Sequence, residues 1–477
     1  MTDAAPSAAP ATKPAQGPRV RQRVLMVTVV WGKWYLDAHL DLNLPSLLAP
    51  QNLPAMAAEH DLTYVLMTIA ADRDRLAKAP AVLALMKFMK VELRVIPNAE
   101  TRDPIAAHQR AWTKATEEAK GTSSYVLYMP PDVAWSDGSF AHLSRLLAQG
   151  YTSIFMTYLR VVSDTFVPAM RAQGATDDIT LRLSGRDLVA LSLDHVHPLM
   201  AAHIHDSRYF PVHPEMVVWP VPGQGLGLRC LAREMFLFDP SRIDMGNQLL
   251  VDGRFNRRDM VFVDDSDDLY AVSLAPLGKD IGWHLTPGPP NLAAVARWWL
   301  IYDSPVNDLI AANFLRWHSG TIDTVRWERR ALASHRWIRR QTALREAMRV
   351  WKLLIEGKSW NAAALLAQAI ETRIVANAFP ATDRPTVVLI PDEARIAAVM
   401  NDATTSRATI LGLLRRHVIF ADTLVQSLEE GIWHNAAGEE LLVQRVEGRL
   451  SVNGCPLLDQ GQQVGRHLVC RIDGLIA

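Results

Sequence analysis

Two acidic residues follow a buried apolar run in the first third of the chain. Residues 125–129 have the composition of a buried strand, two prolines end this run, and Asp132 and Asp137 come next. A carboxylate at the C-terminal end of a strand can hold a divalent cation, whose coordination shell is completed by substrate phosphates. The alternative is a turn in which Ser136 or Asp137 caps the following helix. The first interpretation predicts a phosphate-binding site at Asp132.

A second acidic group lies much later, where four of the five residues 264–268 are aspartate. Asp265-Ser266-Asp267 is an Asp-x-Asp sequence, and neighbouring carboxylates repel one another unless water or a cation screens them. One interpretation is a hydrated hairpin turn between two strands, residues 260–263 and 269–274. In the other interpretation, this loop supplies an additional metal ligand, or it lies on the side of the site where a second substrate binds.

Histidines cluster in Asp194-His195-Val196-His197 and in His203-Ile204-His205-Asp206. Histidines two residues apart share a face on a strand and could chelate zinc there, but on a helix they diverge. The flanking residues 188–193 and 200–202 have helical composition, which disfavours a structural zinc site. His197 remains a candidate metal ligand, and His205 and Asp206 remain candidates for acid–base chemistry.

Alternating strands and helices must position these residues. The sequence predicts strands at residues 24–30, 62–69, 91–96, 125–129 and 152–158, and helices at 35–48, 76–89, 105–119 and 140–149. This alternation is typical of an α/β fold with an open, mostly parallel sheet. Such sheets bind ligands beyond the carboxyl ends of their strands. Trp31, Gly32, Asp72 and Asp132 each follow a strand, so we expect them along one edge of one sheet.

Composition limits the function classes. Lys plus Arg equals Asp plus Glu, at 50 each, so no overall charge attracts nucleic acid or membrane. The three cysteines, Cys230, Cys455 and Cys470, form no Cys-x-x-Cys pair, which favours free thiols in a reducing compartment. Residues 1–21 are rich in Ala and Pro and lack the apolar core of a secretory signal, so we expect a disordered tail and a cytoplasmic protein.

A basic segment, residues 326–352, has apolar positions at helical spacing. Its apolar stripe belongs either to a core, with a solvated basic face, or to a helix lying peripherally on the inner face of an anionic membrane.

Several motifs in residues 22–340 resemble glycosyltransferases of the GT-A fold, and a bacterial group of GT-A-like proteins in particular. The motifs are residues 31–37, 43–50, 135–140 and 219–223. GT-A enzymes carry an Asp-x-Asp near the end of the fourth strand, whereas Pro130-Pro131-Asp132 retains only the second acid. This departure places metal dependence in question.

The resemblance implies a nucleotide-sugar donor and a glycan, lipid or protein acceptor. The base of the donor would lie over the loop of Trp31, Gly32 and Lys33 and near Asp72. Asp132, alone or through Mn²⁺ or Mg²⁺ held with His197, would face the diphosphate, and Arg160 would assist the phosphates. His205 or Asp206 would act as the base on the acceptor side.

The last 120 or so residues resemble a fasciclin-like domain through four ordered motifs and a weaker closing one, at residues 386–394, 413–419, 438–443, 450–454 and 465–473. Such domains bind partners and supply no catalytic residue. We therefore expect a tail (1–21), a GT-A-like domain (22–290), a helical extension (291–354) and a fasciclin-like domain (355–477). The expected function is glycosyl transfer. The alternative is a non-catalytic binding or scaffold protein that uses a degenerate transferase fold and the fasciclin-like domain.

Overall fold

The computed structural model describes residues 21–97, 101–175, 177, 179–231, 235–242, 257–278, 285–288, 295–296, 298–299, 305–356, 385–391, 413, 415–421, 423–464 and 467–476. The chain divides into two compact units. One comprises residues 1–290 and 302–335, and the other comprises residues 291–301 and 336–477. The predicted disordered tail lies outside the described residues, except for Arg21.

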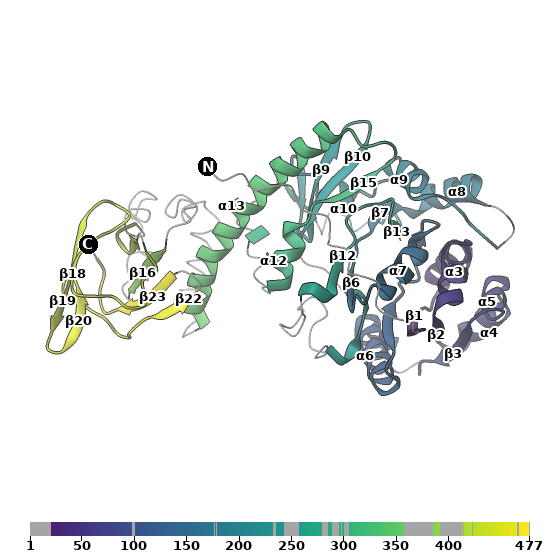
Figure 1. The fold of residues 1–477 in the computed structure, drawn as a ribbon, viewed down its shortest axis with the longest axis horizontal. Helices are drawn as coiled ribbons and strands as arrows, with labels where there is room; N and C mark the ends of the chain where they lie inside the picture. Colours follow the sequence, from purple (N-terminus) through teal and green to yellow (C-terminus); the bar gives the residue numbers. More distant parts are fainter. Residues whose placement is uncertain are drawn as a thin grey trace. The chain divides into compact units, whose positions relative to one another are not determined.

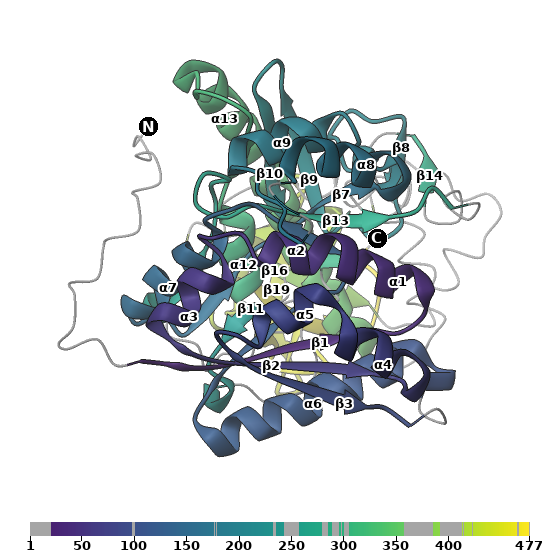
Figure 2. The same cartoon turned by 90° about the vertical axis from the view of Figure 1, so that its right-hand side faces the viewer.

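The first unit is built on a seven-stranded sheet in the order β12-β6-β11-β4-β1-β2-β3 (Figures 1 and 2). Its strands are β1 (Arg23–Val29), β2 (Asp61–Thr68), β3 (Lys90–Val95), β4 (Tyr125–Tyr128), β6 (Ser153–Phe155), β11 (Met235–Phe238) and β12 (Met260–Phe262). All neighbours pair in parallel except β11, which runs antiparallel to β4 and β6. The predicted α/β fold with an open, mostly parallel sheet is confirmed.

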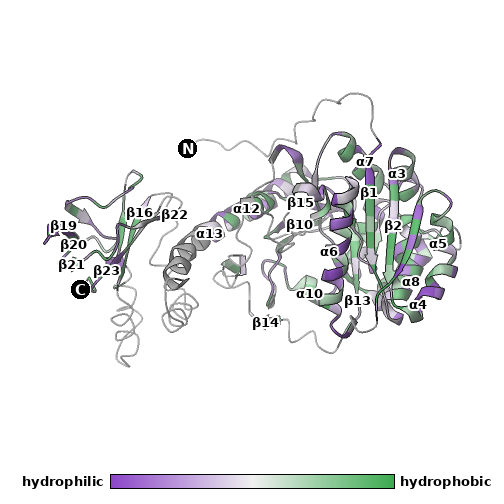
Figure 3. Cartoon of the chain, turned by 90° about the horizontal axis from the view of Figure 1, so that it is seen from below, coloured by the Kyte–Doolittle hydropathy of each residue, from purple (hydrophilic) through white to green (hydrophobic). Residues whose placement is uncertain are grey.

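Helices cover both faces of this sheet, and the sequence of β1 shows why. Leu25, Val27 and Val29 pack into one core with alanines of α6 (Pro104–Thr122). Val24 and Met26, which point the other way, pack into a second core. Helices on that side include α2 (Leu44–Leu47), α3 (Leu53–Glu59), α5 (Pro80–Leu85) and α7 (Ser139–Ala148). A strand buried on both faces is predominantly apolar, and Figure 3 shows β1 mostly in the green of hydrophobic residues.

Two predicted helices differ in detail. Residues 33–47 form one continuous path of α1 (Lys33–Ala38), the π-helix η1 (His39–Asn43) and α2. The single helix predicted at 76–89 is wrong: α4 (Ala70–Lys78) ends and α5 begins at Pro80. Ala79 between them is extended, with φ −66° and ψ 129°, because the residue before a proline is driven out of the helical region.

Smaller sheets complete the first unit. The sheet β5-β13-β7 consists of β5 (Val133–Trp135), β13 (Ala271–Ala275) and β7 (Leu159–Val162), and the sheet β15-β10-β9 of β15 (Leu315–His318), β10 (Gly225–Cys230) and β9 (Met216–Val221). Strands β8 (Tyr209–Pro211) and β14 (Leu285–Pro287) form a pair. The predicted hairpin around residues 264–268 is wrong, because β12 and β13 belong to different sheets.

Five more α-helices follow among the described residues. In sequence order they are α8 (Ser163–Gly174), α9 (Gly185–Leu193), α10 (Pro198–Ala201), α12 (Pro305–Ala312) and α13 (Thr324–Glu356). The predicted basic segment is helical as part of α13, and its Trp327 and Ile338 are buried. Within the described residues, every helix is too short or too polar to traverse a bilayer.

The second unit contains two four-stranded sheets, β17-β16-β23-β22 and β18-β19-β20-β21. Their strands are β16 (Thr386–Pro391), β17 (Val418–Phe420), β18 (Gly431–His434), β19 (Glu440–Val446), β20 (Arg449–Val452), β21 (Cys455–Pro456), β22 (Gln462–Val464) and β23 (His467–Ile472). Buried His417 joins distant segments, since Nδ1 lies 2.7 Å from the Leu413 carbonyl oxygen and Nε2 accepts a hydrogen bond from Ile476 N. All three cysteines are free thiols, as predicted.

Candidate functional site

The loops after β1 and β2 meet at the carboxyl edge of the main sheet. Asp72, in the first turn of α4, accepts a hydrogen bond of 2.8 Å from the backbone N–H of Gly32. Gly32 has φ +80° and ψ 149°, a conformation that only glycine adopts readily. Lys33 is exposed and pairs with Asp37 at 2.6 Å. The structure therefore brings Gly32 and Asp72 together, as the prediction of one shared edge requires.

Asp132 follows β4 at the same edge, and buried Asn43 holds its loop. Asn43 Nδ2 donates to the carbonyl oxygens of Pro130 (3.3 Å) and Val133 (2.5 Å), so it brackets Asp132 on both sides. The Asp132 carbonyl oxygen accepts from Leu274 N at 2.8 Å. Burial raises the pKa of the Asp132 carboxyl to about 6, although the positive charge of Arg160 acts in the opposite direction.

Arg160, on β7, is a cation whose charge acts on two of the predicted residues, Asp132 and His197, and on two others. Its side chain is exposed, yet its charge acts on Asp132, Tyr35, His197 and His203. Burial raises the pKa of the Tyr35 hydroxyl, and the negative charge of Asp132 adds to the rise. The charges of Asp132 and Arg160 therefore act in the same region of the first unit.

His197 is buried, and both of its ring nitrogens have partners. Nδ1 accepts a hydrogen bond from Leu199 N at 3.2 Å as the N-cap of α10, and Nε2 lies 3.4 Å from the Pro276 carbonyl oxygen. Burial lowers the pKa of this imidazole. A metal ligand must offer a free lone pair, so metal binding by His197 stays a prediction that this geometry does not favour.

His205 and Asp206 lie in the turn after α10. His205 Nδ1 is 3.5 Å from Asp206 Oδ1, and the ring packs on Trp219 with centroids 5.9 Å apart. The His205 backbone N–H donates to Val218 O, which fixes the turn to β9. Among the described residues, no hydrogen bond or ion pair joins these two side chains to Asp132 or Arg160. Their role on the acceptor side remains a prediction.

The predicted cap at Ser136 or Asp137 is wrong. The N-cap of α7 is Gly138, and no side chain caps it. Asp137 instead accepts from Gln51 N at 2.8 Å and pairs with Arg182 at 2.7 Å. Ser136 Oγ contacts Ser139 Oγ at 2.9 Å. For Asp137, bonds to distant segments replace the local cap that the sequence predicts.

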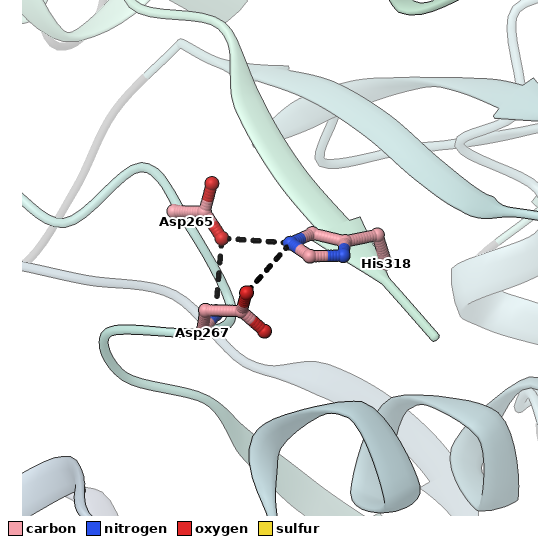
Figure 4. A group of neighbouring side chains, drawn as sticks. All are labelled: Asp265, Asp267 and His318. Carbon is pink, nitrogen blue, oxygen red and sulfur yellow. Dashed lines mark hydrogen bonds and ion pairs between the residues drawn. The ribbon is translucent and has the colours of Figure 1, made fainter. Parts of the chain in front are cut away.

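A second group of functional side chains lies in the loop between β12 and β13 and on β15. His318 Nε2 is 2.9 Å from Asp265 Oδ1 and 3.7 Å from Asp267 Oδ2, as Figure 4 shows. One ligand atom from each residue lies within 4.8 Å of the other two, so the group could hold a metal ion. The sequence indicated Asp265 and Asp267 through their Asp-x-Asp spacing. It gave no signal for His318, which lies 51 positions after Asp267 in the chain.

Positive side chains surround this acidic loop. Arg316 pairs with Asp265 at 2.8 Å, and Arg186 binds both oxygens of Asp267 at 2.9 and 2.6 Å. The hydrogen bond to Asp265 raises the pKa of His318, against the effect of burial. Burial alone would raise the pKa of Asp265, but the bond from His318 and the charge of Arg316 bring it below its ordinary value.

The two groups lie at opposite ends of β13. Asp132 is bonded to Leu274 near the end of this strand, whereas Asp265 and Asp267 precede its first residue, Ala271. A five-residue strand spans about 13 Å. A cavity of about 480 Å³ lies elsewhere, between the η1–α2 segment and the α4–α5 turn, and its lining includes Asp41, Arg75 and Arg171 but no predicted site residue. The molecule therefore presents two separate candidate centres.

No protein-family model matches this chain. No curated protein matches it either. Among solved structures, the chain is similar to one described as GalNAc-T7 with UDP, GalNAc and Mn²⁺, at 10% identity and a TM-score of 0.29. That match covers 95% of this chain and 79% of the other. A TM-score of this size carries no inference about function, which must come from the side chains.

Proposed function

We propose that the first unit binds a nucleotide-sugar donor and transfers its sugar to an acceptor. The observation that supports this most directly is the position of the Asp132 carboxyl beyond the carboxyl end of β4, in a loop held by Asn43 and within reach of the positive charge of Arg160. Ligands of open α/β sheets bind at that edge. In this proposal the diphosphate lies beside Arg160, and the nucleoside lies over Trp31, Gly32 and Lys33 near Asp72.

The chemistry needs positive charge where the leaving group forms. Sugar transfer breaks the bond between the anomeric carbon and the diphosphate oxygen, and negative charge accumulates on the departing nucleoside diphosphate. Arg160 and Lys33 provide cationic hydrogen-bond donors for these oxygens. An acceptor hydroxyl forms the new bond to the anomeric carbon and gives its proton to a base, for which His205 and Asp206 are the candidates.

Asp132 needs a partner in this arrangement, because a lone carboxylate repels a diphosphate. A divalent ion such as Mn²⁺ or Mg²⁺ between the two anions would remove the repulsion and polarise the leaving group. Protonation of Asp132 would remove it as well. Pro130 stands where GT-A enzymes have their first acid, and this favours a second candidate function, a non-catalytic protein that binds nucleotide sugars or a protein partner.

Calorimetric titration of the full chain with nucleoside diphosphates and nucleotide sugars, with and without Mn²⁺, tests the proposal. We expect one nucleotide to bind, and we expect Arg160→Gln to weaken this binding about ten-fold or more. Asp132→Asn should weaken it by a similar factor when Mn²⁺ is present, because the ion then loses its carboxylate ligand. Arg329→Gln, which removes an exposed arginine on α13, is the matched control and should bind like the wild type.

Hydrolysis or transfer of the bound donor, followed by release of the nucleoside diphosphate, distinguishes the two candidate functions. Binding without turnover for every acceptor tried supports the non-catalytic protein. If no nucleotide binds to the folded wild type, the assignment of this edge as a donor site is wrong.

A further inference from the structure

We propose that Asp265, Asp267 and His318 form a binding site for a divalent transition-metal ion, separate from the edge that carries Asp132. The proposal does not depend on the transferase activity. It rests on the orientation of a buried imidazole, on the charges around it and on the way in which the loop is held.

The imidazole of His318 is oriented as a metal ligand. The side chain is 1% exposed, and its Nδ1 lies 2.7 Å from the Gly320 carbonyl oxygen, to which it can only donate. Nε2 therefore faces the oxygens of Asp265 and Asp267, as Figure 4 shows. A histidine whose second nitrogen donates to a carbonyl has its tautomer and ring orientation fixed for metal binding.

The spacing of the three ligand atoms suits an ion. They lie within 4.8 Å of one another, and ligands about 2.1 Å from a tetrahedral zinc ion are roughly 3.4 Å apart. Without an ion, a proton must lie between His318 Nε2 and Asp265 Oδ1, since their separation is 2.9 Å. The ion would replace that proton and draw Asp267 closer from its present 3.7 Å.

The aspartates around the proposed site outnumber the arginines that pair with them by two. Four aspartates lie between positions 264 and 268, and two arginines, Arg186 and Arg316, pair with members of this group. With neutral histidines, two negative charges are uncompensated when all four acids are ionised. A divalent ion restores neutrality.

The loop is already held in place by main-chain bonds. Ser266, between the two ligating aspartates, is fully buried, and its N–H donates to Arg316 O at 3.0 Å. Its hydroxyl oxygen accepts from His318 N, also at 3.0 Å. These bonds join the loop to β15, so the three ligands are positioned before any ion arrives. Such preorganisation reduces the entropy that binding must overcome.

The ligand types indicate the class of ion. One imidazole nitrogen with two carboxylate oxygens suits Zn²⁺, Mn²⁺ or Co²⁺, whereas Mg²⁺ and Ca²⁺ prefer oxygen ligands alone. Affinity should rise from Mn²⁺ to Zn²⁺, following the general order for divalent metals. Three protein ligands leave further coordination positions to water.

The test uses the full chain after removal of metals by a chelator. Calorimetric titration with Zn²⁺, Mn²⁺ and Mg²⁺ gives stoichiometry and affinity, and the visible spectrum after addition of Co²⁺ reports coordination by nitrogen and oxygen. We expect one Zn²⁺ or Co²⁺ per chain and no comparable binding of Mg²⁺. His318→Gln and Asp267→Asn should each weaken Zn²⁺ binding by at least about ten-fold.

His142→Gln is the matched control, because His142 pairs with Asp268 at 3.2 Å but offers no ligand to the proposed ion. Its Zn²⁺ affinity should equal that of the wild type. Asp267 is 41% exposed, so Asp267→Asn should stay folded even if loss of the buried His318 unfolds the chain, and circular dichroism checks this. If Zn²⁺ fails to bind, or binds equally to wild type and folded Asp267→Asn, the site does not exist.

Discussion

Gly185 lies so close to Ser266 that a Cβ at position 185 would come within 2.3 Å of the Ser266 carbonyl oxygen. The contact sets the first residue of α9 directly against the loop that carries Asp265 and Asp267. The neighbouring residue, Arg186, binds Asp267. Close approach of two backbones therefore requires glycine here.

Replacing Gly185 with alanine should push the 264–268 loop away from α9. We expect a loss of unfolding free energy of about 1–3 kcal/mol, together with weaker Zn²⁺ binding than in the wild type. Urea unfolding and metal titration of Gly185→Ala measure both effects. Gly121→Ala is the control, since a Cβ there meets nothing within 4 Å. Unchanged stability of Gly185→Ala would contradict the contact.

The amide of Asn43 should be needed to hold Asp132 in place. In Asn43→Asp, a carboxylate would face two carbonyl oxygens that now accept hydrogen bonds, with a cost of about 2–4 kcal/mol. We expect nucleotide binding to fall further than in Leu85→Ala, a buried substitution in α5 of similar cost that leaves the Asn43 amide in place. Equal binding by two equally destabilised variants would show that Asn43 is structural only.

Arg229 should stabilise the fold without taking part in either candidate site. It is 4% exposed, its guanidinium donates to Ala311 O, Ala312 O and Ser334 Oγ at 2.6–3.0 Å, and it lies 5.5 Å from the Phe314 ring centroid. It thus caps the C-terminus of α12. Burial lowers its pKa to about 10, which still leaves it charged at neutral pH.

Arg229→Met should therefore lower the free energy of unfolding by about 1–3 kcal/mol, because the two helix-terminal carbonyls lose their donor. Arg329→Met, at an exposed position, should change it by less than about 0.5 kcal/mol. Urea unfolding compares them. A gain in stability for Arg229→Met would mean that desolvation of the guanidinium outweighs its hydrogen bonds.

Asp132 should make stability depend on pH between about 4 and 6. Its folded pKa, about 6, lies above the unfolded value near 4, so the folded state holds the proton more tightly. The cost of ionising it in the folded state is absent below pH 4, grows up to pH 6 and is complete above. Asp132→Asn removes that cost, so the variant should gain stability relative to wild type over this range, by about 1–3 kcal/mol. Thermal unfolding at pH 4, 5, 6 and 7 measures the difference, and a constant difference would contradict the raised pKa.

The sequence predicted what depends on local patterns. The apolar run of β1 and the acid after β4 both follow from residues adjacent in the chain, and parallel strands bring their carboxyl ends to one edge. Gly32 and Asp72, 40 residues apart, meet for that reason alone. The α/β class and the place of Asp132 were therefore predictable.

Contacts set by the pairing of distant strands were not predictable. His318 reaches Asp265 only because β15 pairs with β10 and the Asp265 loop bridges to Arg316. Asp137 could have capped α7, but Arg182 and Gln51 compete for its oxygens from other segments. In each case the side chain bonds to a partner that is distant in the sequence. The spacing of residues along the chain does not predict such a partner.

The π-helix η1 has a consequence for insertions and deletions. A π turn is an α-helical path with one additional residue, and one residue rotates the helix by about 100°. Because the wide turn absorbs the additional residue, deleting one residue between Ala38 and Asn43 would convert this path to a regular α-helix and leave Tyr35 and Asn43 on their present faces. Deleting a second residue, from a path that is then regular, would rotate Tyr35 by about 100° relative to Asn43, which anchors Asp132. This short segment should therefore tolerate the loss of one residue but not of two.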